Sequence, residues 1–242
     1  MNKLYVVGIG PGGGESMTLQ ARQILESCDT IVGYTVYVEL LKSQFPDKEW
    51  LTTPMRRETE RCRIAFENAQ RGRKVAMVCS GDAGVYGMAG LMLELSPGYP
   101  DCEVEVVAGV TAALSGAAAL GAPLMHDFAV ISLSDLLTPW ETIERRLRCA
   151  AVADMAICLY NPASRKRADY LQRACDILLE TLEPERTCGL AARLGRKGES
   201  CEVLTLAQLR ERPVDMFTTV FIGNSQTKTV GGKLVTPRGY PI

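Results

Sequence analysis

The sequence predicts an α/β fold with a largely parallel sheet, and three observations support this prediction. Short β-rich segments alternate along the whole chain with segments of helical length and amphipathic spacing. The 242 residues suffice for one large α/β domain or for two domains of roughly 120 residues each. Hydrophobic residues make up 47% and charged residues 23% of the chain, so a buried core rather than disorder is expected.

The first half of the chain follows a strand-then-helix order. LYVVGI (4–9) is typical of a buried strand, and Thr18 is placed to cap a helix that ends near Cys28. The longest uncharged stretch, 106–125, contains glycines, a proline and hydroxyl side chains, so it predicts a strand end, a loop and a small-residue helix rather than a membrane span. The other elements expected in this half are strands over 29–34, 75–79 and 104–107 and helices over 35–45, 58–71 and 83–95.

The same pattern starts again after Pro123. A helix that begins at Pro139 fits the preference of proline for the first helical turn. Because no Gly/Ser-rich linker separates the halves, any domain boundary within 110–124 must be tightly packed. The elements expected in this half are strands over 128–134, 154–160, 187–193 and 217–223 and helices over 139–150 and 164–182.

Charge and residue usage exclude several classes of function. The net charge of −1 provides no field that would hold nucleic acid or an anionic membrane. Nine cysteines without a C-x-x-C pair, several of them in apolar runs such as VAMVCS, indicate buried reduced thiols and a reducing cytosol. His126 is the only histidine in the sequence, which excludes HExxH and multi-histidine metal sites, and no secretory signal is readable. We therefore expect a cytoplasmic protein without a protein-bound metal.

A glycine-rich segment, GIGPGGG (8–14), directly follows the first predicted strand. Gly8, Gly10 and Gly13 match the G-x-G-x-x-G pattern of dinucleotide-binding proteins. Pro11, however, lacks the N–H that a phosphate would bind, and the next helix begins too late for its N-terminus to reach a pyrophosphate. A dinucleotide site is therefore the least favoured interpretation, while a plain tight turn and a different small-molecule site both remain open.

Two further loops follow predicted strands in the same way. SGDAGVYG (80–87) contains three glycines, and GVTA (109–112) comes after the next strand. Because ligands in α/β proteins bind at the carboxyl ends of parallel strands, the three loops are expected to line one edge of one sheet. Ser80 and Asp82 have a simpler alternative role as caps of the following helix.

Two segments of the second half carry charged or titratable side chains. In YNPASRKR (160–167), Arg165 and Arg167 could pair with carboxylates of a substrate, the alternative being a solvated basic helix start. His126 lies next to Asp127 and is an acid/base candidate, although a single histidine is often only a structural hydrogen-bonding group.

The motifs together resemble a known enzyme family. The segments GIGPGGGESMTLQA, SGDAGVYGMAG, AGVTAALSGAAALGAPLMHDFAVISLSDLLTPW, YNPASRKR and TPRGY are similar to those of the tetrapyrrole (class III) methyltransferases of cobalamin biosynthesis. The likeness extends over nearly the whole chain and is greatest to the subgroup that methylates C17 of precorrin-3B or cobalt-factor III. Ala108 departs from the family, in which proline commonly precedes Gly-x-Thr, so this loop is expected to be looser.

The resemblance implies an architecture and a cofactor. We expect two α/β domains, 1–112 and 113–242, with S-adenosyl-L-methionine in a cleft between them, in a homodimer. Carried over by motif, the cofactor-binding residues would be Gly10, Pro11, Gly12, Ser80, Gly81, Asp82, Val85, Tyr86, Thr111, Ala112, Tyr160, Asn161, Ala192 and Thr236.

The implied chemistry is compatible with this composition. Methyl transfer to carbon requires alignment and a dry pocket more than a protein nucleophile. Ring contraction coupled to methylation at C17 would in addition need a proton donor or acceptor, for which His126, Asp127, Ser132 and Asp135 are the candidates in that order. The acceptor would be an anionic tetrapyrrole, whose carboxylates Arg165, Arg167 and Arg196 are expected to bind, with Arg56, Arg57, Arg61, Arg193 and Lys197 as further candidates.

Three alternative functions remain at this point. One is another methyltransferase of the same fold, and a second is an NAD(P)-binding oxidoreductase. The third is a ligand sensor that binds S-adenosylmethionine without releasing S-adenosylhomocysteine.

Overall fold

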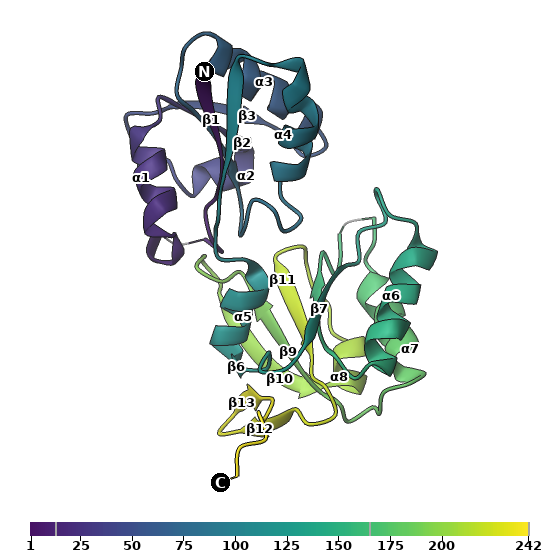
Figure 1. The fold of residues 1–242 in the computed structure, drawn as a ribbon. Helices are drawn as coiled ribbons and strands as arrows, with labels where there is room; N and C mark the ends of the chain where they lie inside the picture. Colours follow the sequence, from purple (N-terminus) through teal and green to yellow (C-terminus); the bar gives the residue numbers. More distant parts are fainter. Residues whose placement is uncertain (13, 165, 242) are drawn as a thin grey trace. The chain divides into compact units, whose positions relative to one another are not determined.

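The computed structural model describes residues 1–12, 14–164 and 166–241, and the chain divides into two compact units, Met1–Ala112 and Ala113–Ile242 (Figure 1). Each unit has its own sheet covered by helices, which confirms the predicted α/β class. In the described part of the chain no helix is both long and apolar enough to span a membrane.

The first unit is built on a parallel sheet of five strands within the described residues, in the order β3-β2-β4-β1-β5. All five strands run in the same direction, so their carboxyl ends share one edge of the sheet. The strands are β1 (Asn2–Gly8), β2 (Thr30–Tyr34), β3 (Glu49–Thr53), β4 (Val75–Cys79) and β5 (Cys102–Val107).

Helices cover both faces of this sheet, which explains why its central strands are apolar on both faces. Phe66 and Met92 lie in the core on one face, and Leu25 and Leu41 lie in the core on the other. Figure 1 shows α1 on the opposite side of the sheet from α3 and α4. The helices are α1 (Leu19–Ser27), α2 (Thr35–Glu39), α3 (Glu58–Gln70) and α4 (Ala89–Leu95), with 3₁₀ turns at Gly14–Ser16 and Ser96–Gly98.

Two helix predictions in this unit are confirmed and two need correction. Thr18 caps α1 as predicted, because its hydroxyl oxygen accepts a hydrogen bond from the Ala21 N–H at 3.1 Å. Helix α3 has nearly the predicted bounds. Helix α2 ends at Glu39 instead of residue 45, and α4 begins at Ala89 instead of residue 83. The late start of α4 follows from the bend at Tyr86, whose φ of 54° interrupts any helix.

The second unit contains a mixed sheet, so the prediction of a largely parallel sheet is wrong here. Among the described strands the order is β10-β9-β11-β8-β7, and only β7 and β8 are parallel neighbours. The connection between β9 and β10 is too short for a parallel crossover, which requires an antiparallel pair. The strands are β7 (Phe128–Ser132), β8 (Ala156–Tyr160), β9 (Thr187–Ala192), β10 (Ser200–Thr205) and β11 (Thr218–Ile222).

Helices again cover both faces of the second sheet. α6 (Trp140–Val152), α7 (Tyr170–Leu179) and α8 (Leu206–Arg210) pack over one core, and α5 (Ala112–Leu120) packs over the other. A Cβ atom at Gly116 would lie 2.6 Å from the Phe221 ring, so α5 approaches β11 closely. A smaller sheet joins β6 (Gly121–Ala122) to β12 (Lys228–Val230) and β13 (Lys233–Val235).

Helix α7 begins six residues later than predicted. Ser164 and Arg167 exchange two backbone hydrogen bonds, of 3.2 and 2.9 Å, in a turn that precedes the helix. Lys166 and Arg167 therefore lie before α7 and not in its first turn. Arg165, a predicted substrate-binding residue, lies outside the described residues.

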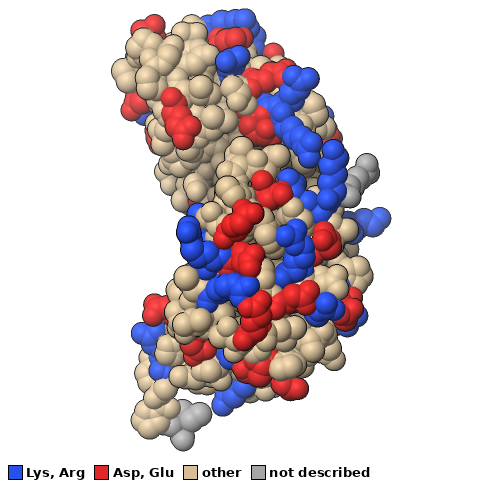
Figure 2. All heavy atoms as spheres, turned by 90° about the vertical axis from the view of Figure 1, so that its right-hand side faces the viewer, with Lys and Arg blue, Asp and Glu red and all other residues tan. Residues whose placement is uncertain are grey.

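The interpretation of the cysteines as buried thiols is confirmed for most of them. Cys149 and Cys201 are exposed, and the other seven are buried; in the described structure all nine are free. Burial raises the pKa of the Cys79 and Cys158 thiols to about 12, so both stay neutral near pH 7. On the face drawn in Figure 2, basic and acidic side chains are interspersed, in keeping with the net charge of −1.

Candidate functional site

The first two glycine loops are joined to each other by their backbones. Gly10 N–H donates to the Gly81 carbonyl at 3.0 Å, and Gly81 N–H donates to the Gly10 carbonyl at 2.8 Å. Both residues have left-handed φ values, +76° and +71°, which glycine adopts without steric cost. The sequence pattern thus reflects two loops that follow β1 and β4 and meet at the carboxyl edge of the sheet.

Asp82 joins the second loop to the third. One of its carboxylate oxygens accepts hydrogen bonds from the N–H groups of Gly84 and Val85, at 2.8 and 3.2 Å. The other oxygen accepts from the Gly109 N–H at 2.9 Å. The carboxylate therefore organises two loops. It does not cap α4, the alternative raised from the sequence, because that helix begins only at Ala89.

The third loop packs directly against the backbone of the other two. A Cβ atom at Gly109 would lie 2.2 Å from the Gly81 carbonyl oxygen and 2.7 Å from the Gly8 Cα. The Ala108 carbonyl accepts a hydrogen bond of 3.3 Å from the Thr18 hydroxyl. This bond ties the third loop to Thr18, the residue that caps α1.

The surface of this edge has the character of a small-molecule site without phosphate-binding features. Tyr86 is 56% exposed, Pro11 and Thr111 are partly exposed, and Gly12 is buried. Helix α1 begins only at Leu19, so its N-terminus does not follow the first loop directly. Backbone groups and small residues at this surface fit a ligand that approaches the main chain closely, such as a nucleoside with an amino-acid side arm.

The second unit brings several predicted residues together at one edge of its own sheet. Strands β7, β8 and β9 run in the same direction, so Ser132, Tyr160 and Ala192 all lie where a strand ends. The Asn161 side-chain amide donates to the Ser132 hydroxyl at 2.9 Å, and the Tyr160 hydroxyl accepts from the Ala113 N–H at 2.6 Å. This edge is therefore fixed by side chains.

Asp135 and Arg167, predicted separately as an acid/base group and a substrate-binding group, form an ion pair with each other. The Tyr170 hydroxyl donates to the other Asp135 oxygen at 2.6 Å. The Tyr170 bond and the Arg167 guanidinium hold the pKa of Asp135 below its ordinary value of 3.8, and the same contact raises the pKa of Tyr170. Asp135 is thus a carboxylate near neutral pH.

Tyr170 was not identified from the sequence. Its ring packs 4.7 Å from Trp140, and the Arg173 guanidinium lies 4.0 Å from the centre of the Trp140 ring. A tyrosine at the start of an amphipathic helix carries no signal that distinguishes it from a core residue. Only the contact with Asp135, 35 positions away, reveals its role.

Two further basic candidates, Arg193 and Arg196, have partners within the second unit. Arg193 forms an ion pair of 2.6 Å with Asp215, and the Arg196 guanidinium lies 5.2 Å from the centre of the Phe217 ring. Ala192 and Arg193 contribute to a surface cavity of about 320 Å³. Ala192 and Arg196 thus lie at the same edge of the sheet as Ser132.

His126, Asp127 and Thr236 lie at the opposite edge of the second sheet. His126 and Asp127 precede β7, whereas Ser132 ends it, so the four acid/base candidates form two separate pairs. The His126 Nε2 atom is hydrogen-bonded to the Pro237 carbonyl oxygen at 2.8 Å. His126 and Asp127 line a surface cavity of about 440 Å³ with Asp154 and Gln226.

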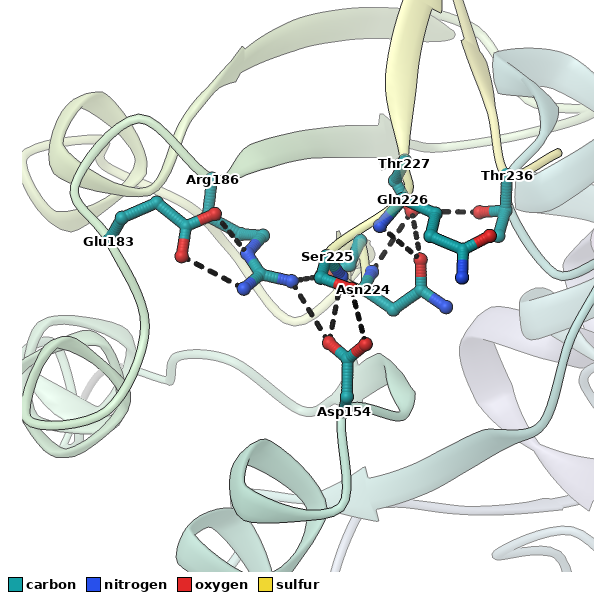
Figure 3. A network of polar contacts seen from close by, with 9 residues as sticks. Asp154, Glu183, Arg186, Asn224, Ser225, Gln226, Thr227 and Thr236 are labelled. Atoms are coloured by element: carbon teal, nitrogen blue, oxygen red, sulfur yellow. Dashed lines mark hydrogen bonds and ion pairs between the residues drawn. The ribbon is translucent and has the colours of Figure 1, made fainter.

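Thr236 belongs to a polar network that anchors the end of the chain (Figure 3). Its hydroxyl donates to the Pro123 carbonyl at 2.7 Å and contacts the Thr227 hydroxyl at 2.8 Å, and its side chain is buried. The network includes the Asn224 side chain and, from the next residue, Ser225, it continues to Asp154 and the buried Arg186. Although burial opposes it, hydrogen bonds from Ser225 and the charge of Arg186 lower the pKa of Asp154.

Metal ligands do not cluster in the part of the chain that the structure describes. Among those residues, no group of three or more His, Cys, Asp or Glu side chains is placed to hold an ion.

Comparisons with known proteins place these features among methyltransferases. The family model described as tetrapyrrole (corrin/porphyrin) methylases matches residues 3–210. A probable cobalt-factor III C(17)-methyltransferase of Salmonella typhimurium is 48% identical over 99% of this chain and 100% of that protein. A precorrin-3B C(17)-methyltransferase of a Sinorhizobium species is 39% identical over 98% of this chain and 96% of that protein.

Solved structures agree with the sequence comparisons. The crystal structure of the methyltransferase CobJ has a TM-score of 0.89 at 36% identity, and it covers 98% of this chain and 100% of that chain. A uroporphyrin-III C-methyl transferase from Thermus thermophilus, complexed with S-adenyl homocysteine, has a TM-score of 0.71 at 22% identity over 91% of this chain and 92% of that chain. The latter similarity concerns the fold.

Proposed function

The chain belongs to the tetrapyrrole (corrin/porphyrin) methylase family, and from this membership we propose that it methylates C17 of precorrin-3B or cobalt-factor III in cobalamin biosynthesis. It is an S-adenosylmethionine-dependent methyltransferase. Relatives named for cobalt-factor III and a relative named for precorrin-3B each match nearly the full length of the chain.

The observation that carries the proposal is the assembly of three glycine loops into one edge of the first sheet. The pair of hydrogen bonds between Gly10 and Gly81 and the Asp82 contact with Gly109 hold these loops together. We infer that Pro11, Gly12, Ser80, Val85, Tyr86, Thr111 and Ala112 form the cofactor surface on these loops. When bound, S-adenosylmethionine supplies an electrophilic methyl group, and the loops would fix its position and exclude water.

The edge of the second unit supports a proposal for the acceptor side. Ser132, Asp135 and Asn161 lie there with Arg167 and Arg196, which fits an anionic ligand that also needs proton transfer. We propose that Tyr160, Asn161 and Ala192 also contact the cofactor, while Thr236 keeps the structural role that its contacts describe.

The proposed reaction includes ring contraction, which requires an acid or base. Ser132, which contacts Asn161, and Asp135, which pairs with Arg167, are the favoured pair, and His126 with Asp127 is the other pair. We expect Ser132→Ala and Asp135→Asn to slow product formation while S-adenosylhomocysteine binds as before. An unchanged rate for His126→Ala would remove that histidine from the chemistry.

The decisive experiment is incubation with S-adenosylmethionine and either cobalt-factor III or precorrin-3B, followed by mass spectrometry of the pigment. The proposal requires that one acceptor gain a single methyl group and that S-adenosylhomocysteine appear in equal amount. Cofactor binding without S-adenosylhomocysteine release would instead indicate a sensor, and calorimetric binding of NAD would favour an oxidoreductase. A homodimer and a cytoplasmic location complete the proposal, and light scattering of the purified protein tests the former.

A further inference from the structure

Arg61 is a buried cation at the carboxyl edge of the first sheet. It lies in the first turn of α3 and is 4% exposed, whereas Arg63, on the same helix, is exposed. The sequence suggested Arg61 only as one of several surface arginines for substrate carboxylates. The structure instead places its guanidinium inside the first unit.

Every partner of the Arg61 guanidinium in the described structure is neutral. Its Nε–H donates to the Thr53 hydroxyl at 2.8 Å, and Nη2 donates to the Pro54 carbonyl at 3.0 Å. The Tyr34 ring centre lies 5.9 Å from the guanidinium carbon. No carboxylate among the described residues comes within ion-pair distance of Arg61.

Arg186 is the other deeply buried arginine among the described residues, and it has charged partners. Arg186 is 7% exposed, and it pairs with two carboxylates, those of Asp154 and Glu183. A buried guanidinium is costly unless an anion compensates its charge. Arg61 lacks the anion that Arg186 has, so its charge is available to an anion that the chain itself does not provide.

The neighbours of Arg61 lie at the carboxyl ends of strands in the first sheet. Tyr34 and Thr53 end strands β2 and β3, and the Met88 thioether, 3.9 Å from Nη1, belongs to the segment that follows the second glycine loop. The guanidinium therefore lies under the same edge that carries the proposed cofactor surface.

The hydrogen bond of Arg61 Nη1 to the Met88 sulfur is the weakest of the guanidinium contacts. A thioether is a poor hydrogen-bond acceptor, and it belongs to a flexible, unbranched side chain that is partly exposed. The Met88 backbone is held separately, since its N–H donates to the Cys79 sulfur at 3.4 Å. The Met88 side chain can therefore move aside while the loop stays in place.

We propose that Arg61 binds a carboxylate of the ligand, with the Met88 side chain displaced from Nη1. This inference rests on the proposed function, which supplies two carboxylate sources. One is the amino-acid part of S-adenosylmethionine, and the other is a side chain of the tetrapyrrole. Arg61 would thus help to decide which molecules the edge accepts.

The test uses Arg61→Met, Arg61→Lys and the matched control Arg63→Met in the full chain. Calorimetry measures the Kd of S-adenosylhomocysteine and of 5′-methylthioadenosine, which is a similar thioether nucleoside without the amino-acid part. Steady-state kinetics at saturating S-adenosylmethionine measure the KM of the tetrapyrrole. Arg63→Met should leave all three values within about twofold of the wild type.

Two outcomes support the inference and distinguish the sources. If the cofactor carboxylate is the partner, Arg61→Met weakens S-adenosylhomocysteine at least tenfold and leaves 5′-methylthioadenosine unchanged. If the tetrapyrrole is the partner, both nucleosides bind as before and the KM of the tetrapyrrole rises at least tenfold. Arg61→Lys keeps the charge but loses the planar guanidinium, so its loss of affinity should be smaller in either case. If Arg61→Met fails to fold, Arg61→Lys takes its place in the test.

Two other outcomes overturn it. An equal loss for both nucleosides, or no change in any of the three values, would mean that Arg61 only supports the fold. The proposed function fails separately, and the inference with it, if the wild-type protein binds neither nucleoside.

Discussion

The two sheet edges of this chain are built by different means. In the first unit, loops are joined by backbone hydrogen bonds and by the close approach of Gly8, Gly81 and Gly109. In the second unit, the corresponding ends of β7 and β8 are joined by side chains, among them Asn161 with Ser132 and Tyr170 with Asp135. The first edge depends mainly on close backbone contact at glycines, to which the Asp82 carboxylate adds one link, and the second edge depends on polar side chains.

This difference teaches how each edge responds to substitution. A close backbone contact cannot adjust when a Cβ atom is inserted, because each loop is held in place by the strand that it follows. A pair of side chains can lose one hydrogen bond and still keep its packing. Substitutions should therefore have large effects in the first unit and graded effects in the second.

Gly109→Ala should produce the largest effect. The new Cβ would lie 2.2 Å from the Gly81 carbonyl oxygen, so the third loop must separate from the second. We expect loss of detectable S-adenosylhomocysteine binding by calorimetry and a lower Tm. Gly90→Ala is the matched control, since nothing lies within 4 Å of its Cβ position and it lies in α4, where alanine stabilises by about 0.5–1 kcal/mol. Normal binding by Gly109→Ala would contradict the backbone contact.

Asp82→Asn should have the next largest effect. The variant keeps one acceptor oxygen for Gly84 and Val85 but turns an amide toward the Gly109 N–H, so two donors face each other. An unsatisfied donor of this kind costs about 1–3 kcal/mol, which corresponds to a roughly 5- to 150-fold loss of S-adenosylhomocysteine affinity if the loop shifts. Asp101→Asn, in the turn before β5, provides the charge-matched control. Equal affinities for Asp82→Asn and the wild type would show that the carboxylate does not position the third loop.

Tyr170→Phe should have a smaller effect, on stability. The variant keeps the ring against Trp140 and removes only the hydrogen bond to Asp135, with an expected cost of about 1 kcal/mol in chemical denaturation. Arg173→Lys at the same cluster tests packing on the Trp140 ring without touching this bond. A loss above that of a core truncation would mean that the second edge is as rigid as the first.

The same cluster predicts a pH dependence of stability. Because the pKa of Asp135 is lowered in the folded state, its contribution is present above the ordinary value of 3.8 and is lost as pH falls through the folded-state pKa. The stability difference between the wild type and Asp135→Asn should therefore be constant near neutral pH and vanish in acid. Urea titrations from about pH 3 to pH 7 measure it, and a difference that grows toward acid would contradict the assignment.

Thiol labelling should give the smallest effect, because it probes exposure without altering the fold. Cys149 and Cys201 are the exposed cysteines, and burial raises the pKa of Cys175 to about 12. Iodoacetamide at about pH 8 should modify the two exposed thiols in the native protein and all nine after unfolding. Peptide mass spectrometry identifies the sites, and rapid native labelling of Cys79 would show that the edge beneath the second loop opens.

The first edge could be located from the sequence because its contacts leave a compositional trace. Strands that are buried on both faces read as continuous apolar runs, and β4 has the predicted bounds. Close backbone approach requires glycine, so the loops at Gly10, Gly81 and Gly109 were recognisable from their residues alone. The family resemblance then supplied the chemical function, which is now supported by relatives along the full chain.

The features that were missed have weaker traces. Strands β3 and β10 lie at the edges of their sheets and are only partly buried, so their apolar pattern is faint. The late start of α4 follows from the left-handed backbone of Tyr86, and that of α7 from the backbone bonds between Ser164 and Arg167, neither of which helix propensity registers. The partnership of Asp135 with Tyr170 and the burial of Arg61 depend on long-range contacts that spacing alone cannot reveal.

The close packing of α5 has a consequence for ligand recognition that lies outside both edges. Gly116 leaves no space between this helix and the Phe221 ring, and the helix starts at Ala112, the last residue of the third loop. A larger side chain at position 116 would push α5 away from β11 and displace the third loop. If the third loop contacts the cofactor as proposed, substitutions at Gly116 should therefore alter ligand binding without any change in a contacting residue, and random mutagenesis could recover such variants.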